Sequence, residues 1–174
     1  MKNLVLIGFM GSGKTSAGKR AAQRLGMKFV DMDDMIEQRH GQTISELFEK
    51  EGEPFFRQQE RALVRELSDG QDRVIATGGG VVLDPNNLRD FNRTSVVICC
   101  WVDAHVAHER TKHAKHRPLL EAEADRLAQI ETLLRQREAL YKAIPNCIDT
   151  SAMSVEQQAD EIVRIYQERM KADG

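Results

Sequence analysis

Short apolar runs alternate along the chain with longer polar stretches of helix length. The runs are residues 4–7, 28–30, 74–76, 96–102 and, more weakly, 147–148. Continuous apolar runs this short are typical of strands that are buried on both faces of a parallel sheet, and helices are the usual connections between such strands. The pattern therefore predicts an α/β fold, in which a parallel sheet carries helices on its faces.

Helix starts are marked at several boundaries of this pattern. Thr43 is followed three residues later by Glu46, and Ser154 by Gln157, which is the spacing of a capping box. Asp84 precedes a proline, which is favoured at the first position of a helix. These signals support the alternation of strands and helices.

Composition adds limits to this picture. A chain of 174 residues with 30% charged and 41% hydrophobic residues is expected to form one globular domain, residues 1–174. The formal net charge of −2 gives no overall attraction to nucleic acid or membranes, so we expect neither as a partner. No apolar stretch approaches a signal sequence or a membrane span, and the three cysteines form no disulfide framework, so we expect a cytoplasmic protein.

The first apolar run leads directly into the sequence GFMGSGKT, residues 8–15. Its spacing fits the pattern G-x-x-x-x-G-K-[ST], in which backbone N–H groups surround a phosphate, the lysine reaches the outer phosphates and the hydroxyl binds magnesium. A helix that begins here adds its positive dipole end. We interpret the segment as a phosphate-binding loop that uses Mg²⁺.

A dinucleotide-binding loop is the main alternative interpretation. Gly11 and Gly13 begin a G-x-G-x-x-G pattern, and Asp33 lies at a suitable distance for a ribose contact. Ser16 stands where the third glycine belongs, and that motif gives no role to a Lys-Thr pair. The phosphate-binding loop is therefore favoured.

Carboxylates follow the second apolar run, at the sheet edge where α/β proteins bind ligands. They are Asp31, Asp33 and Asp34, and we expect one of them, with Asp34 as the candidate, to cap the next helix. For the acid beside the metal, Asp31 competes with Asp103 and Asp149. The hydrophobic pattern alone favours Asp103, because the strand before it is the longest apolar run, but periodicity does not decide the matter.

Two arginines stand at positions that suggest an anionic ligand. Arg137 falls on the apolar face of a helix predicted over residues 125–141, where a guanidinium is costly unless it meets an anion. Arg57 has Glu60 one helical turn away, which can orient it. Two such groups suit a carboxylate or phosphate, although structural ion pairs remain an alternative. The glycines at 78–80 allow either a tight turn or a close approach to a ligand.

Taken together, six segments resemble the shikimate kinase family over nearly the whole chain. They are GFMGSGKT, VDMDDMIE, GEPFFRQQE, ATGGGVV, HRPLL and QREALY. The resemblance implies a five-stranded parallel sheet of the nucleoside-monophosphate-kinase-like P-loop kinase type, with a lid at about residues 111–122 and acceptor-binding helices at about residues 32–67. It also implies transfer of the γ-phosphate of ATP to the 3-hydroxyl of shikimate, on the pathway to aromatic amino acids.

The resemblance further implies a role for particular residues. Thr15 would bind Mg²⁺ with Asp31 in support, and Asp33 would contact the reacting hydroxyl. Lys14 and Arg117 would act on the phosphates, with Arg117 on the lid, and Arg110 would lie against the adenine. The remaining ATP contacts would come from Gly11, Ser12, Gly13 and Ser16, and the remaining shikimate contacts from Arg57, Arg137, Gly78, Gly79 and Gly80.

Other functions share the phosphate-binding loop. A gluconate or nucleoside-monophosphate kinase would use arginines on a carboxylate or phosphate in the same way, and a non-catalytic nucleotide-binding module would keep the loop and bind a protein. The basic residues Lys112, Lys115 and Arg117 suit a lid over ATP better than a nucleic-acid patch, because the segment is short and has no interleaved aromatic residues. We expect a monomer whose partners are ATP and shikimate.

Overall fold

The computed structural model describes residues 1–112 and 126–172 of the chain. Strands and helices alternate along it, as the hydrophobic pattern predicts. The strands are β1 (Asn3–Ile7), β2 (Lys28–Asp31), β3 (Arg73–Ala76), β4 (Ser95–Trp101) and β5 (Cys147–Asp149). The helices are α1 (Lys14–Leu25), α2 (Met32–His40), α3 (Ile44–Ser68), the 3₁₀ turn η1 (Val81–Leu83), α4 (Pro85–Thr94), α5 (Ala104–Thr111), α6 (Arg126–Lys142) and α7 (Val155–Ala172).

The five strands form one sheet in the order β2-β3-β1-β4-β5, and every neighbouring pair is parallel. All five apolar runs of the sequence are strands of this sheet, so the predicted fold class is confirmed. β1 lies at the centre, where Val5 is paired with Ile75 of β3 and with Val97 of β4. The carboxyl ends of all five strands consequently meet at one edge of the sheet.

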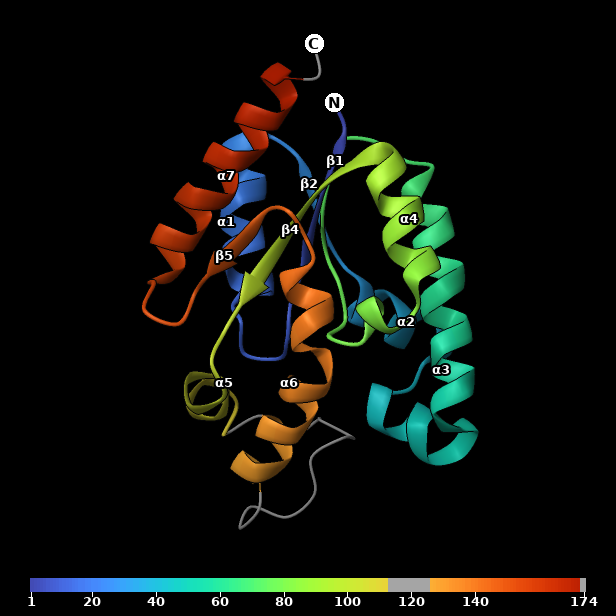
Figure 1. The fold of residues 1–174 in the computed structure, drawn as a ribbon. Helices are drawn as coiled ribbons and strands as arrows, with labels where there is room; N and C mark the ends of the chain where they lie inside the picture. The colour runs from blue at the N-terminus through green and yellow to red at the C-terminus, as the bar shows by residue number, and fades with distance from the viewer. Residues whose placement is uncertain (113–125, 173–174) are drawn as a thin grey trace.

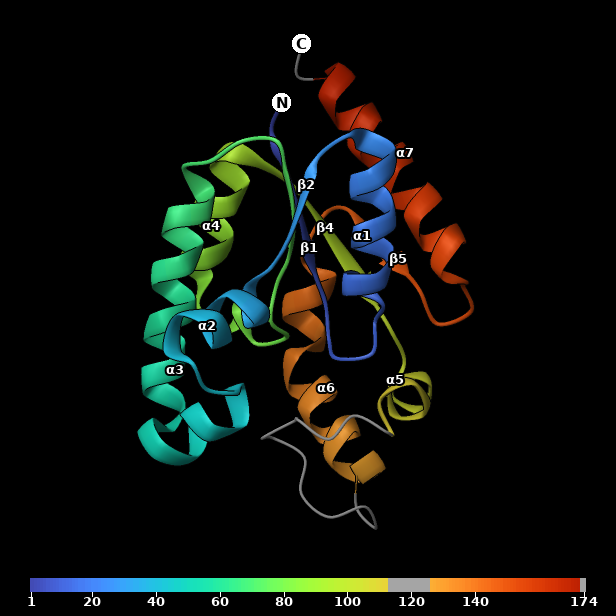
Figure 2. The same ribbon diagram turned by 180° about the vertical axis from the view of Figure 1, so that it is seen from behind.

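Helices cover both faces of the sheet (Figures 1 and 2). α1 and α7 lie together on one face, where Leu4 and Leu6 of β1 pack against side chains such as Ile162. On the other face Val5 and Ile7 pack into a larger core with α3, α4 and α6. Because β1 is buried on both faces, it carries no polar alternation, which is why it appears in the sequence as a continuous apolar run.

The predicted helix starts are confirmed in their local geometry. Thr43 and Glu46 form both hydrogen bonds of a capping box at the start of α3, and the Asp84 side chain caps α4 ahead of Pro85. The reciprocal bonds between Ser154 and Gln157 precede α7. α3 is interrupted at Gly52, whose φ of 82° is left-handed.

One capping prediction is wrong. α2 is capped by Asp31, whose carboxylate accepts from the backbone N–H groups of Asp33 and Asp34, so Asp34 is a first-turn residue and not the cap. Asp31 is the last residue of β2, and an N-cap accepts from N–H groups two and three residues ahead. The same carboxylate therefore ends a strand and starts a helix.

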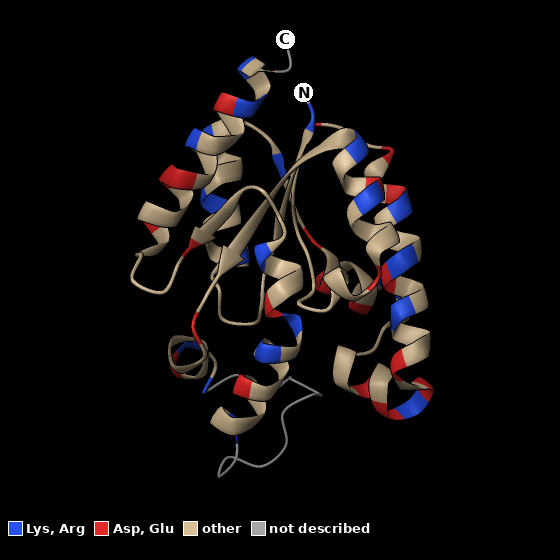
Figure 3. Ribbon diagram, in the orientation of Figure 1, with Lys and Arg blue, Asp and Glu red and all other residues tan. Residues whose placement is uncertain are grey.

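Charged residues gather on the helices and at strand ends, and the middle of the sheet is almost free of them (Figure 3). Cys99 and Cys100 of β4 are buried, as expected for cysteines that pack in an apolar run, whereas Cys147 is exposed. Within residues 1–112 and 126–172, no helix has the length and apolar character needed to cross a membrane.

Candidate functional site

A cavity of about 810 Å³ opens at the carboxyl edge of the sheet. The loop after β1 forms one side of it, and further lining comes from α2, α3, α5, α6, the glycine loop after β3 and the start of α7. Its charged, hydroxyl and glycine lining includes Gly11, Gly13, Lys14, Thr15, Ser16, Asp31, Asp33, Arg57, Gly78, Gly79, Gly80, Arg110 and Arg137. The cavity thus brings together nearly all the site residues that the sequence predicts within the described ranges; Ser12 is buried in the loop behind it.

The loop between β1 and α1 has the backbone of an anion site. Gly13 stands at the N-cap of α1 in the left-handed conformation, with a φ of 89°, and no side chain caps the helix. The first N–H groups of α1 therefore have no capping side chain and lie beside the cavity. Lys14 Nζ donates to the carbonyls of Gly8 at 2.7 Å and Phe9 at 3.0 Å, so its ammonium is held over the loop.

Thr15 and Asp31 meet across the sheet edge. Thr15 Oγ1 donates to Asp31 Oδ2 at 2.9 Å. The two other acids considered for the metal lie elsewhere: Asp103 caps α5 through Val106 N, and Asp149 accepts from the backbone of Ser151. The hydrophobic pattern alone favoured Asp103, but the acid that contacts Thr15 is Asp31, whereas Asp103 is the N-cap of α5.

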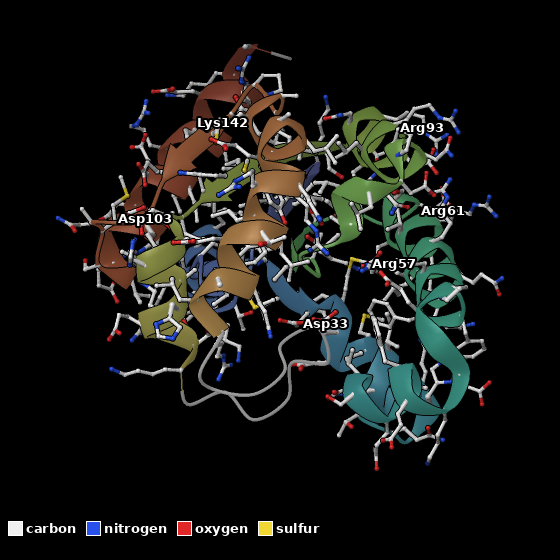
Figure 4. All side chains as sticks on the ribbon, turned by 60° about the horizontal axis from the view of Figure 1, so that its bottom comes forward. Asp33, Arg57, Arg61, Arg93, Asp103 and Lys142 are labelled. Carbon is white, nitrogen blue, oxygen red and sulfur yellow. The ribbon has the colours of Figure 1, made fainter. Side chains whose placement is uncertain are left out.

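Figure 4 views the molecule from the carboxyl edge of the sheet. Asp33 on α2 and Arg57 on α3 lie on the same side of the space in front of α6, whereas Asp103 lies far from both. Arg61 of α3 and Arg93 of α4 lie away from Asp33 in this view. Arg61 is engaged by Asp90 at 2.6 Å and belongs to the packing of α3 on α4.

Arg57 is fixed by two acids of its own helix. Its Nη1 lies 2.8 Å from Glu60 Oε1, and its Nε and Nη2 lie 3.1 Å and 3.0 Å from Glu53 Oε1. The guanidinium also rests on the backbone of Gly80, because a Cβ atom there would lie 2.3 Å from Arg57 Nη2. Gly80 is therefore needed for the position of Arg57, a reason that differs from both a tight turn and a close approach to a ligand.

Glu60 is a buried carboxylate at the base of the cavity, with 2% of its side chain exposed. Burial raises its pKa to about 7, Arg57 and Arg137 act in the opposite direction, and Asp33 adds to the rise. Its Oε2 has no hydrogen-bond partner within the described residues. A Cβ atom at Gly78 would lie 3.0 Å from an Asp33 oxygen and 3.1 Å from Glu60 Oε2, so both acids face this glycine.

Arg137 is buried on the inner face of α6, as the periodicity predicts. It shares that face with Ile130, Leu134 and Tyr141, which are all buried. The Tyr141 hydroxyl donates to the Gly79 carbonyl, and burial raises the pKa of Tyr141 to about 12. Arg137 lies near Gly79 as well, with Nη1 3.8 Å from where a Cβ atom would stand.

Arg110 projects from the end of α5 toward the phosphate loop. Its Nη1 donates to Gly11 O at 3.1 Å and its Nη2 to Thr150 O at 2.9 Å. Arg117 and residues 113–122 of the predicted lid lie outside the described residues. The start of the helix predicted from residue 125 does so too, and α6 is described from Arg126.

Sequence reasoning missed several residues that line the cavity or support the phosphate loop behind it. Ile44, Phe48 and Phe56 form an apolar wall, and the sequence offered no signal that separates them from core residues. Gln158 and Thr150 approach the phosphate loop from beyond β5, at Gly13 and Ser12. The segment after Thr150 carries no motif, so only the folded chain identifies them.

The oxygen atoms of Thr15 and Asp31 fit a magnesium ion. Mg²⁺ takes oxygen ligands, and in nucleotide sites it uses one or two protein groups together with phosphates and water. Such a site does not need a protein cage, and within the described residues no group of three or more His, Cys, Asp or Glu is placed to hold a metal ion. Two oxygen donors match the number that Mg²⁺ takes from a protein when phosphates and water supply the other ligands.

Comparisons with known proteins agree with this geometry. Residues 10–167 match the family model described as Shikimate kinase. The chain is 43% identical over 167 residues to a shikimate kinase from Thermodesulfovibrio yellowstonii, covering 96% of each chain, and 42% identical over 168 residues to one from Pelotomaculum thermopropionicum, covering 97% of each.

A solved structure, the shikimate kinase from Acinetobacter baumannii in complex with shikimate, is similar in fold. It superposes with a TM-score of 0.89 at 32% identity, covering 99% of this chain and 94% of that one. The sequence matches extend over nearly the full length, and the sheet order, the phosphate loop and the acid-and-arginine cavity lie within the matched region. The chain belongs to the shikimate kinase family.

Proposed function

We propose that this protein transfers the γ-phosphoryl group of ATP to the 3-hydroxyl of shikimate. The observation that carries the proposal is the cavity itself, in which a carboxylate, Asp33, and two inward guanidinium groups, Arg57 and Arg137, lie beside the phosphate-binding loop. Shikimate is a small acid with several hydroxyl groups. The guanidinium groups suit the carboxylate of such a molecule, and the Asp33 carboxylate suits one of its hydroxyl groups.

ATP would bind along the loop between β1 and α1. The N–H groups at the start of α1 face the phosphates, and Lys14 leaves the Gly8 and Phe9 carbonyls to reach the β- and γ-phosphates. Thr15 and Asp31 would hold Mg²⁺, which supplies charge neutralisation at the phosphate oxygens. Gly11, Ser12, Gly13 and Ser16 complete the loop, with Arg110 against the adenine.

Shikimate would bind between α2, α3 and α6. Arg57 and Arg137 are proposed to take its carboxylate, since Arg57 is held by Glu53 and Glu60 and Arg137 is buried on the inner face of α6. Gly78, Gly79 and Gly80 allow the ring to approach the backbone. The apolar wall of Ile44, Phe48 and Phe56 suits the carbon face of the ring.

The protein contributes position and charge to the reaction. Phosphoryl transfer needs an attacking oxygen in line with the γ-phosphorus and stabilisation of the charge on the equatorial oxygens. Asp33 is proposed to orient the 3-hydroxyl and accept its proton, and Lys14 to stabilise the phosphate charge. Arg117, which lies outside the described residues, is proposed on the resemblance alone to contribute from the lid.

A coupled assay of ADP release tests the proposal. Purified protein with ATP and Mg²⁺ should release ADP slowly, and shikimate should accelerate the release strongly, because water is a poor substitute for an acceptor held in place. Gluconate and nucleoside monophosphates serve as alternative acceptors. Faster release with one of them, or ADP release that shikimate leaves unchanged, would overturn the assignment.

We further propose that the enzyme acts as a monomer in the cytoplasm. In support, the described residues of one chain bring the phosphate loop, Asp33, Arg57 and Arg137 together at the same cavity. Sedimentation at the enzyme concentration of the assay tests the oligomeric state.

A further inference from the structure

Thr150 follows β5 directly and is fully buried. Its hydroxyl lies 2.9 Å from the carbonyl oxygen of Ser12 in the phosphate loop and 2.8 Å from that of Trp101 at the end of β4. Its own carbonyl accepts from Arg110 Nη2 at 2.9 Å. One small side chain therefore lies at the junction of the sheet, the phosphate loop and the arginine assigned to the adenine.

The hydroxyl proton of Thr150 matters most for the Ser12 carbonyl, because the Trp101 carbonyl keeps the backbone N–H bond of Thr150 whichever way the hydroxyl turns. A threonine hydroxyl has one proton to donate, and two carbonyls lie within reach. The Trp101 carbonyl already accepts the backbone N–H of Thr150 at 2.8 Å. Only one bond from Thr150 reaches the loop, and it is the bond to Ser12 O.

This bond fixes a peptide plane that matters for phosphate binding. The peptide group is planar and trans, so the C=O of Ser12 and the N–H of Gly13 point in opposite directions. With the carbonyl directed at Thr150, the Gly13 N–H points away from it, and Gly13 lines the cavity. A carbonyl turned toward the phosphates in its place would repel them.

We propose that Thr150 is a positioning residue for ATP: its hydroxyl holds the Ser12–Gly13 peptide in the orientation that presents an N–H group to the phosphates. The proposal rests on the proposed nucleotide-binding role of the loop. Thr150 itself does not line the cavity and touches neither substrate.

Two neighbours restrict the same loop and make the role of Thr150 specific. Arg110 holds the preceding carbonyl, that of Gly11, at 3.1 Å. Gln158 packs against Gly13 so closely that a Cβ atom there would lie 2.2 Å from its Oε1. The loop is thus held at three successive residues, and the Ser12 carbonyl is the position that depends on Thr150.

A matched pair of variants tests the proposal. Thr150→Val keeps the size of the side chain and removes the donor, whereas Thr150→Ser keeps the donor and removes a methyl group. We expect the valine variant to have an ATP KM about tenfold above that of the serine variant, the loss that one hydrogen bond explains. The shikimate KM should be the same in both.

The separate KM values distinguish positioning from a general structural effect. A loss of packing would affect the serine variant as well and would raise both KM values. If the valine chain does not fold, Thr150→Cys, whose thiol is a weak donor of similar size, replaces it in the same comparison. An ATP KM within twofold between the paired variants would overturn the proposal, while shikimate-dependent ADP release by the wild-type protein would leave the assigned activity standing.

Discussion

Thr15 Oγ1 donates a hydrogen bond to the Asp31 carboxylate at 2.9 Å, although Thr15 follows β1 and Asp31 ends β2, two strands that are not neighbours in the sheet. Thr15 is in the first turn of α1, after the central strand, and Asp31 ends the outer strand β2. β3 lies between these two strands. The contact therefore links the start of α1 to the end of β2 past the intervening strand β3. It places the hydroxyl of Thr15 beside an acid at the carboxyl edge of the sheet.

This contact predicts the effect of changing Asp31. Asp31→Asn should raise the Mg²⁺ concentration for half-maximal activity about tenfold or more, because the acid that supports the metal loses its charge. Asparagine is as good an N-cap as aspartate, so the start of α2 should persist. Activity measured against Mg²⁺ checks the expectation. Asp103→Asn is the matched control, since Asp103 also caps a helix after a strand and should leave the Mg²⁺ dependence unchanged.

The contact between Gly80 and Arg57 predicts a selective loss of acceptor binding. In Gly80→Ala the new methyl group would overlap the Arg57 guanidinium, so the arginine must move out of its place. We expect a higher KM for shikimate with an ATP KM close to that of the wild type. In Gly70→Ala the methyl group displaces the Arg73 guanidinium in a similar way outside the cavity. Equal shikimate KM values for the two variants would contradict the role of Arg57.

Arg137 is predicted to bind the acceptor and not ATP. Arg137→Ala should raise the KM for shikimate by about thirtyfold or abolish turnover, because the carboxylate of shikimate would lose one of the two cations proposed to bind it. ATP affinity, measured by calorimetry with a non-hydrolysable analogue, should stay nearly intact. Arg135→Ala, which removes an exposed arginine from the same helix, serves as the control. Unchanged shikimate kinetics in Arg137→Ala would mean that Arg137 only forms structural ion pairs.

Asp33 is predicted to act in the chemical step. Asp33→Asn should lower kcat by about 10²- to 10⁴-fold, the range for loss of a group that orients and deprotonates a nucleophile. Shikimate binding should weaken less, since the amide still accepts a hydrogen bond from the hydroxyl. Asp34→Asn changes an exposed acid one residue away and should leave kcat close to the wild-type value. A similar fall in both variants would exclude a specific role for Asp33.

The buried Glu60 predicts a dependence of stability on pH. Its pKa is raised from 4.5 to about 7, so the folded chain binds the proton more tightly than the unfolded chain. The resulting stabilisation is complete below pH 4.5 and is lost as the pH rises through about 7. Between these values the Glu60 contribution to the free energy of unfolding should fall by about 1 kcal/mol per pH unit.

For Glu60→Gln, the free energy of unfolding measured with denaturant across this pH range should not show the fall that Glu60 causes in the wild-type protein. Glu66→Gln is a control on the same helix, because Arg39 lowers the pKa of Glu66 and its titration lies below the window. If Glu60→Gln followed the wild-type pH dependence, Glu60 would be ionised throughout and its pKa would not be raised.

The sequence by itself determined the strands, most helix starts, the phosphate loop and the inward position of Arg137. These features depend on local patterns: a strand buried on both faces must be apolar at every position, and a capping box or a phosphate loop is contained within a few consecutive residues. The resemblance to the shikimate kinase family added proposed roles for residues such as Asp33, because Asp33 lies in a segment that matches the family as a whole.

The hydrophobic pattern left Asp31, Asp103 and Asp149 open and the resemblance pointed to Asp31, but only the tertiary structure showed that Asp31 reaches Thr15. Only the tertiary structure brought Thr150 to the phosphate loop. Asp31 and Asp149 end strands and Asp103 follows one by two residues, so all three lie at the same edge, and local sequence does not say which of them reaches Thr15. Thr150 is 138 residues from Ser12 and has no motif around it. Such contacts depend on the strand order and on the path of each loop, which are set by the packing of the whole chain and not by any short stretch of it.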